Sequence, residues 1–156
     1  MSRTTRFMSC TPDDVFEVLA DGWSFASWVV GAARIREVDD SWPQPGSRIH
    51  HSVGVWPMLI DDTTSVLSVD RPHTMELKVR AWPTGEGRVR IECTVEEGGT
   101  RVVMTEDATD GPAKLVPRPV RDPMLDARNT ESLKRLGFLA ERQAADSSRA
   151  KRVEST

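Results

Sequence analysis

The sequence predicts one α+β domain in which a curved antiparallel sheet wraps a long C-terminal helix. Its 156 residues fit a single domain of ordinary size. Six strand-like runs follow one another at short spacing between residues 33 and 109, which favours hairpins over βαβ crossovers. A leucine stripe after residue 124 indicates one long helix, and helices segregated on one face of an antiparallel sheet define the α+β class.

The first 28 residues predict a strand and two short helices. Thr4–Cys10 is β-prone, and Thr11 then supplies an N-cap ahead of a proline and two acids in the first helical turn. This helix ends at Asp21-Gly22. A Trp-rich short helix or turn follows at Trp23–Trp28.

The middle of the chain predicts the sheet. Proline and glycine clusters divide it into runs that are rich in β-branched and apolar residues. With the strand near the N-terminus, they give a sheet of six to seven strands. The predicted strands are Ile35–Val38, Ser47–Trp56, Leu59–Val69, Met75–Trp82, Arg88–Glu97 and Thr100–Ala108.

The C-terminal third predicts a connection, a helix and a tail. Prolines make Gly111–Pro123 a connection, and the helix runs from Leu125 to about Gln143. Its apolar stripe must lie on another element. Residues 1–143 are therefore the predicted ligand-binding domain, and the polar segment 144–156 is a predicted disordered tail.

Strand alternation predicts which side chains face inward, because successive residues point to opposite faces. The inward rows are mostly apolar, but His51 shares a row with Val53, and Glu106 shares one with Met104. Asn129 interrupts the leucine stripe of the helix. Buried polar groups are costly without partners, so these positions indicate water or ligand inside, or a strand end at solvent.

Several segments together resemble the START/Bet v 1-like superfamily, also called SRPBCC or the polyketide cyclase/dehydrase and lipid transport family. They are TPDDVFEVLADG, WSFASWVVGAARI, PGSRIHHSVGVWP, IDDTTSVLSVDRP, GTRVVMTED and NTESLKRLGFLAE, and they span Arg6 to about Glu141. The resemblance implies a helix-grip fold with a ligand cavity between sheet and helix. Its members include lipid and hormone carriers, aromatase/cyclases, oxygenase domains and co-chaperones. No catalytic motif of the family transfers to these positions.

The cavity that this resemblance implies gives a set of candidate ligand-binding residues. His51 and Glu106 are the candidate acid/base groups, since a neutral imidazole or a buried carboxyl group can exchange protons. The alternatives are a structural, hydrogen-bonded histidine and a glutamate that pairs with an arginine or meets solvent. The complete set is Trp28, His51, Val53, Leu77, Val79, Ile91, Cys93, Met104, Glu106, Asn129, Leu133 and Leu136.

Other conspicuous residues have two readings each. Trp23 could stack on a ligand at the cavity mouth or cover the core edge. Arg118 and Arg121 could meet a ligand carboxylate or pair with local acids such as Asp122. Of the adjacent acids Asp61-Asp62, at least one is expected to be solvated.

Charge and cysteine content exclude several classes of protein. The net charge is -3 and basic residues are scattered among acids, so no nucleic-acid partner is expected. No run approaches a membrane span, so we expect no stable membrane insertion and a cytoplasmic location. Cys10 and Cys93 form no metal or redox motif; we expect buried free thiols and no metal or cofactor.

Three functions fit these observations. The first is binding or carrying a small hydrophobic molecule such as a polyketide, lipid or aromatic metabolite, as a monomer or homodimer. The second is a cyclase or dehydratase that uses His51 or Glu106 as its acid/base group. The third is a co-chaperone-like interaction module, which would have a filled interior and an exposed apolar patch.

Overall fold

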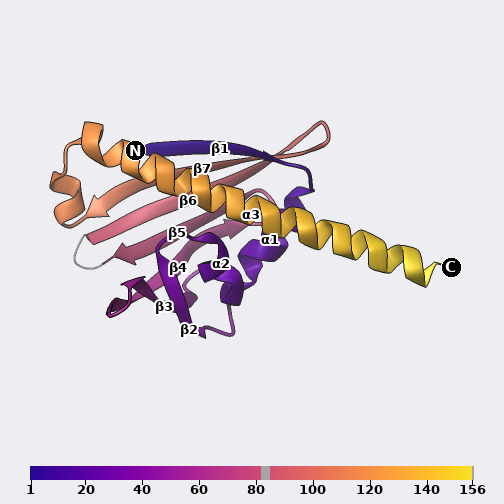
Figure 1. The fold of residues 1–156 in the computed structure, drawn as a ribbon, viewed down its shortest axis with the longest axis horizontal. Coiled ribbons are helices and arrows are strands. Elements are labelled where there is room, and N and C mark those ends of the chain that lie inside the picture. The colour runs from indigo at the N-terminus through magenta and orange to yellow at the C-terminus, as the bar shows by residue number, and fades with distance from the viewer. Residues whose placement is uncertain (82–84, 156) are drawn as a thin grey trace.

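The chain folds into a seven-stranded antiparallel sheet that curves around one long helix, as the computed structural model shows for residues 1–81 and 85–155 (Figure 1). The strand order is β1-β7-β6-β5-β4-β3-β2. Strands β2 to β7 therefore form a meander, and the N-terminal strand β1 pairs with β7 at the other edge of the sheet. The strands are β1 (Ser2–Met8), β2 (Ala32–Val38), β3 (Arg48–Val55), β4 (Met58–Asp70), β5 (Thr74–Ala81), β6 (Gly85–Glu96) and β7 (Gly99–Asp110).

These strands confirm the predicted fold class, with ends that move by a few residues. Trp82, the predicted end of one strand, lies outside the described residues. β6 begins at Gly85, three residues before the predicted start. Near the tip of the β6–β7 hairpin, Val95 is 70% exposed although alternation places it on the same face as the buried Ile91 and Cys93.

Two short helices after β1 fill one end of the sheet's concave face. α1 (Pro12–Ala20) begins with the predicted cap, in which the Thr11 hydroxyl accepts from the Asp14 amide and the Asp14 carboxylate accepts from the Thr11 amide. A 3₁₀ turn, η1 (Gly22–Ser24), leads into α2 (Phe25–Trp28). This reciprocal cap explains why the helix starts at Pro12, after a short connection from β1.

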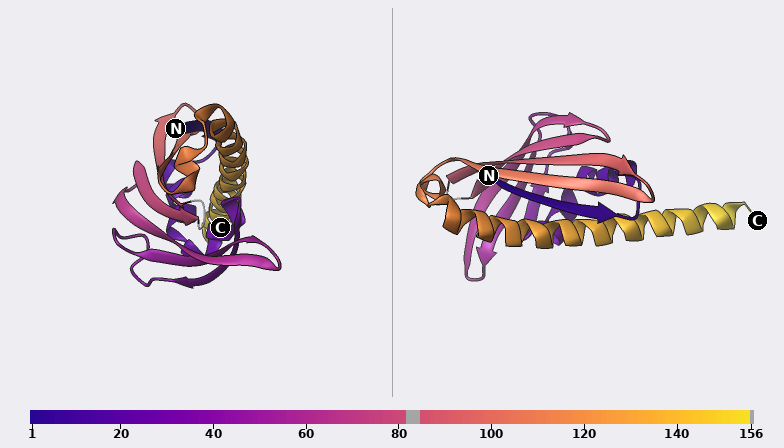
Figure 2. Two further views of the ribbon diagram at one scale, coloured as in Figure 1. Left: turned by 90° about the vertical axis from the view of Figure 1, so that its left-hand side faces the viewer. Right: turned by 90° about the horizontal axis from the view of Figure 1, so that it is seen from above.

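The long helix α3 (Arg118–Glu154) lies along the open side of the curved sheet and closes it (Figure 2). Both predicted helix ends need correction. The helix starts at Arg118, after a second 3₁₀ turn η2 (Pro112–Leu115), because Pro123 near its start removes only one backbone hydrogen bond. It continues beyond Gln143 to Glu154, since no glycine or proline interrupts a run rich in Ala, Arg and Lys.

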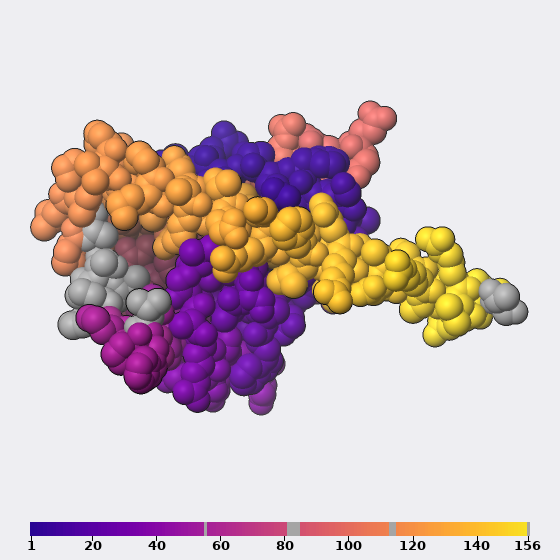
Figure 3. Space-filling model, in the orientation of Figure 1, coloured from indigo at the N-terminus to yellow at the C-terminus, as the bar shows by residue number. Residues whose placement is uncertain are grey.

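The end of α3 leaves the body of the domain (Figures 1 and 3). The residues from Ala145 to Ser155 are all exposed, and Ala144 is the last one that packs against the core. Segment 144–154 is thus helical rather than disordered, while the domain boundary after residue 143 stays a prediction. None of the helices within residues 1–81 and 85–155 combines the length and apolar character that spanning a membrane requires.

The packed core occupies the half of the sheet that α1 and the middle of α3 cover. Met8, Phe16, Ile91, Leu133 and Leu136 are all at most 1% exposed there. The leucine stripe of α3 thus lies on the sheet, as the sequence predicted. The half of the sheet nearer the start of α3 is not filled in this way, and it holds the candidate site.

Candidate functional site

A cavity of about 460 Å³ lies between the concave face of the sheet and the first turns of α3. Strands β3 to β7, helix α2 and α3 all contribute to its wall. Most of the wall is apolar, and its larger side chains include Phe25, Trp28, Leu77, Met104, Met124 and Leu125. This volume and composition are usual for a small-molecule site.

The structure brings many of the predicted ligand-binding residues to the wall of this cavity, although contact with a ligand stays a prediction. The wall includes Trp28, His51, Val53, Leu77, Val79, Met104, Glu106 and Asn129. Four others, Ile91, Cys93, Leu133 and Leu136, lie in the packed core instead. Strand alternation and the leucine stripe of the helix gave the inward direction of these residues, but neither could show how far along the strand or helix the cavity extends.

His51 lies on β3 with its ring buried in the cavity wall. Its Nε2 lies 2.9 Å from the Thr64 hydroxyl, and its ring stacks on Phe25 at 5.6 Å between centroids. Burial lowers the pKa of His51, an effect that Asp62 partly opposes and Arg36 and His50 reinforce. The imidazole is therefore neutral near pH 7. Its buried Nδ1 has no hydrogen-bond partner among the described residues.

Glu106 lies on β7 and is only 5% exposed. Its Oε2 accepts a hydrogen bond from the guanidinium of Arg128, which projects from α3 across the end of the cavity. Arg128 also donates to the Asn129 side-chain oxygen at 3.4 Å. Pairing with an arginine was one of the two alternatives to an acid/base role, and it is the arrangement that the structure contains.

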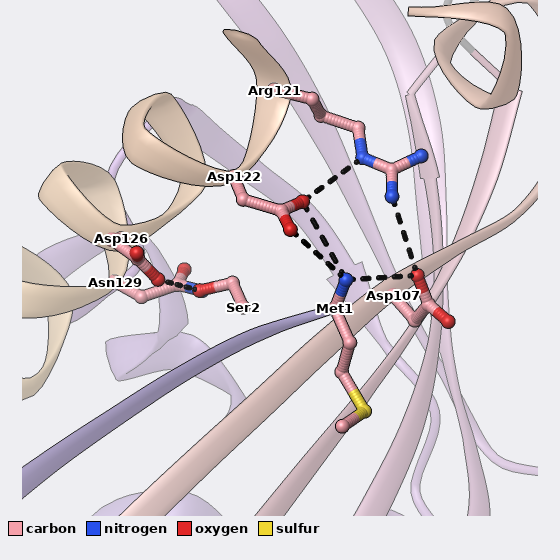
Figure 4. Close-up of polar contacts among 7 residues, drawn as sticks. All are labelled: Met1, Ser2, Asp107, Arg121, Asp122, Asp126 and Asn129. Atoms are coloured by element: carbon pink, nitrogen blue, oxygen red, sulfur yellow. Dashed lines mark hydrogen bonds and ion pairs between the residues drawn. The ribbon is translucent and has the colours of Figure 1, made fainter. Parts of the chain in front are cut away.

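Arg121 forms a second ion-paired cluster at the same end of the cavity (Figure 4). Its Nη2 lies 3.6 Å from Asp107 and its Nε lies 3.4 Å from Asp122, so it pairs with local acids. Beside it, the Ser2 hydroxyl donates to Asp126 at 2.5 Å and accepts from Asn129 at 3.3 Å. These contacts join β1, β7 and α3 through polar side chains.

Several residues of the cavity wall were not predicted from the sequence. Phe25, Thr64 and Arg128 line the cavity. Of these three, only Arg128 could have been predicted, from its spacing along the helix. It follows Leu125 by three positions and precedes Ser132 by four, so it shares their helix face. Thr64 lies close to His51 because of the β3–β4 register, which places the two residues on one face and two positions apart along the ladder. The sequence alone does not show this register.

The remaining candidates lie away from the cavity. Trp23 is 62% exposed, and Arg118 is exposed at the start of α3. Asp61 is exposed whereas Asp62 is buried, which confirms the expected divergence. Cys10 and Cys93 are buried free thiols; burial raises their pKa to about 11 and about 12, respectively. Within the described ranges, no three His, Cys, Asp or Glu side chains gather as a metal site.

His51 and Glu106 lie on opposite parts of the wall. Strands β4, β5 and β6 separate β3 from β7 in the sheet. An acid/base pair needs both groups within hydrogen-bond reach of one reacting atom. Each group has its own hydrogen-bond partner, Thr64 for His51 and Arg128 for Glu106, rather than the other group. The site therefore resembles a binding cavity with two separate polar groups in its wall.

A curved antiparallel sheet that grips a long helix around an apolar cavity defines the helix-grip class of ligand-binding folds. Residues 2–141 match the family described as polyketide cyclase / dehydrase and lipid transport. The chain belongs to this family, and the resemblance noted in its sequence is confirmed. No curated protein matches the sequence.

Solved structures share this fold at low sequence identity. The protein NE0264 from Nitrosomonas europaea is 15% identical with a TM-score of 0.68, over 90% of this chain and 94% of its own. The crystal structure of Ara h 8.0201 is 13% identical, with a TM-score of 0.66 over 88% of this chain and 95% of its own. The di-domain ARO/CYC StfQ from the steffimycin biosynthetic pathway is 13% identical, with a TM-score of 0.71 over 92% of this chain and 51% of its own.

Proposed function

We propose that the protein binds or carries a small hydrophobic molecule, such as a polyketide, lipid or aromatic metabolite, in the cavity between the sheet and α3. The observation that supports this most strongly is the unfilled, mainly apolar cavity of about 460 Å³. A ligand bound there removes apolar surface of both the ligand and the cavity wall from water. Each Å² of buried apolar surface contributes a favourable free energy of roughly 25 cal/mol. Membership of a family described by lipid transport and polyketide chemistry is consistent with this proposal.

We also infer that the protein acts in the cytoplasm, as a monomer or homodimer, and binds no nucleic acid. Its basic side chains are scattered among acids, and many of them form ion pairs with those acids. A surface of this kind releases few counterions from a nucleic acid. The ligand is therefore proposed to be a small molecule rather than a polymer.

The second candidate is an enzyme of the cyclase or dehydratase type. Its support is the neutral, buried imidazole of His51 in the cavity wall, which could take or give one proton. Glu106 is a weaker acid/base candidate because Arg128 holds its carboxylate. A cyclisation could still proceed with a single proton-transferring group and a cavity that holds a reactive conformer.

Native mass spectrometry of the protein purified from its own cells tests the proposal. We expect a reproducible added mass that disappears on denaturation. If that molecule is returned chemically altered after incubation, and His51→Gln abolishes the alteration, the enzyme replaces the carrier. Protein that has only its own mass, and that also fails to bind neutral hydrophobic dyes, would contradict both candidates.

A further inference from the structure

The ionisable groups of the cavity wall differ in whether their hydrogen-bonding atoms are already occupied. Among the described residues, the cations of the wall are Arg80, Arg121 and Arg128. Arg80 pairs with Glu86 at 2.9 Å, Arg121 with Asp107 and Asp122, and Arg128 with Glu106. All three are thus neutralised by carboxylates that belong to the protein. A ligand carboxylate would have to compete with those acids.

The two carboxylates of the wall are not equivalent. Glu86 uses both oxygens, because Lys78 lies 2.7 Å from Oε2 and Arg80 lies 2.9 Å from Oε1. Glu106 uses only Oε2, toward Arg128. Its Oε1 has no hydrogen-bond partner in the described parts of the chain. That oxygen lies beside Gly87 of β6, where an added Cβ would be 3.9 Å away, and Gly87 also lines the cavity.

Because Glu106 lines the cavity and binds Arg128 through Oε2, its Oε1 can accept a hydrogen bond only from water or from a ligand in the cavity. A hydrogen-bond donor on the ligand would form a charge-assisted bond with this oxygen. A cationic donor would approach the guanidinium of Arg128 on the other oxygen, whereas a neutral hydroxyl group avoids that repulsion. A ligand carboxylate would face Glu106 itself.

We propose that Oε1 of Glu106 is a ligand-recognition point for a hydroxyl group, so that the cavity selects neutral, hydroxylated hydrophobic molecules, such as phenols, over carboxylic acids of the same size. This inference rests on the proposed binding function and narrows it. Arg128 positions the carboxylate from the helix side and leaves its other oxygen directed to the ligand. Free fatty acids would accordingly be poor ligands.

Three probes with one ring system test this: 2-naphthol, naphthalene and 2-naphthoic acid, each titrated into the ¹⁵N-labelled full chain and followed by chemical-shift changes near neutral pH. We expect 2-naphthol to bind at least about tenfold more tightly than naphthalene, and 2-naphthoic acid to bind most weakly. Glu106→Gln should reduce the advantage of 2-naphthol and improve binding of 2-naphthoic acid, because Arg128 loses its carboxylate.

The matched control is Glu76→Gln, which removes a glutamate from a comparable ion pair with Arg88 that does not line the cavity. It should leave all three affinities unchanged. Equal binding of 2-naphthol and naphthalene by the wild type, or a preference for 2-naphthoic acid, would overturn the inference while the binding function stands. Failure of all three probes to bind in the cavity would contradict the proposed function itself. The wild-type ranking decides the matter even if Glu106→Gln does not fold.

Discussion

At the scale of single residues, the buried polar groups carry most of the information about function. His51 and Glu106 sit in one apolar wall but have different surroundings: the imidazole pairs with a hydroxyl group, and the carboxylate pairs with a guanidinium. Burial favours the neutral form of the imidazole, and the nearby carboxylate of Asp62 opposes this effect only in part. Both residues therefore have consequences that can be measured one substitution at a time.

The lowered pKa of His51 makes stability depend on pH. The unfolded chain binds a proton near the ordinary value of 6.5, whereas the folded chain binds it only at lower pH. The contribution of the neutral His51 side chain to stability is complete above about pH 6.5, and it is lost as the pH falls toward the pKa of the folded state. Thermal unfolding between about pH 7.5 and about pH 5.5 should show decreasing stability, and His51→Gln should flatten this slope. His73→Gln, at an exposed histidine, is the control; an equal slope in His51→Gln and wild type would contradict the assignment.

The raised pKa values of Cys10 and Cys93 predict slow thiol chemistry. At about 11 and about 12 they leave almost no thiolate near neutral pH, and burial blocks reagents as well. A disulfide reagent such as DTNB should label the native protein far more slowly than the denatured protein, which should release two equivalents of thiol. Rapid labelling of either cysteine in the native state would contradict this burial.

At the scale of elements, α3 performs two tasks along its length. Its first turns close the cavity, and its middle packs on the sheet through Leu133, Leu136 and Ala140. The last turns contact little, since the residues after Ala144 are exposed. At 37 residues the helix is about 55 Å long, so part of it extends past the domain.

This division predicts that a substitution in the middle of α3 lowers stability strongly and that one near its end has almost no effect. Leu136→Ala leaves a cavity in the packed core and should lower the free energy of unfolding by about 2–5 kcal/mol. Val153→Ala, at a side chain that is 78% exposed, should change it by no more than about 0.5 kcal/mol. Denaturant unfolding measures both values. Comparable losses in the two variants would mean that the end of α3 is packed against something.

At the scale of the whole molecule, the sequence predicted the architecture better than the extent of the cavity. Period-two alternation placed His51 and Glu106 inward because their rows are otherwise apolar. It could not separate Ile91, in the core, from Leu77, at the cavity wall, because both face inward. Arg128 was missed since a long charged side chain is normally assigned to solvent, and Pro123 concealed the first turns of α3.

The central claim is that the unfilled space inside this fold binds one hydrophobic molecule. Fluorescence titration with the neutral dye Nile red tests it most directly, with two variants that each add one tryptophan. Val79→Trp fills the cavity from β5, and Val95→Trp places the same side chain on the exposed end of β6. The wild type and Val95→Trp should bind one equivalent of dye with equal affinity, while Val79→Trp should bind at least about tenfold more weakly. Undiminished binding by a folded Val79→Trp protein, or no binding by the wild type, would contradict the claim.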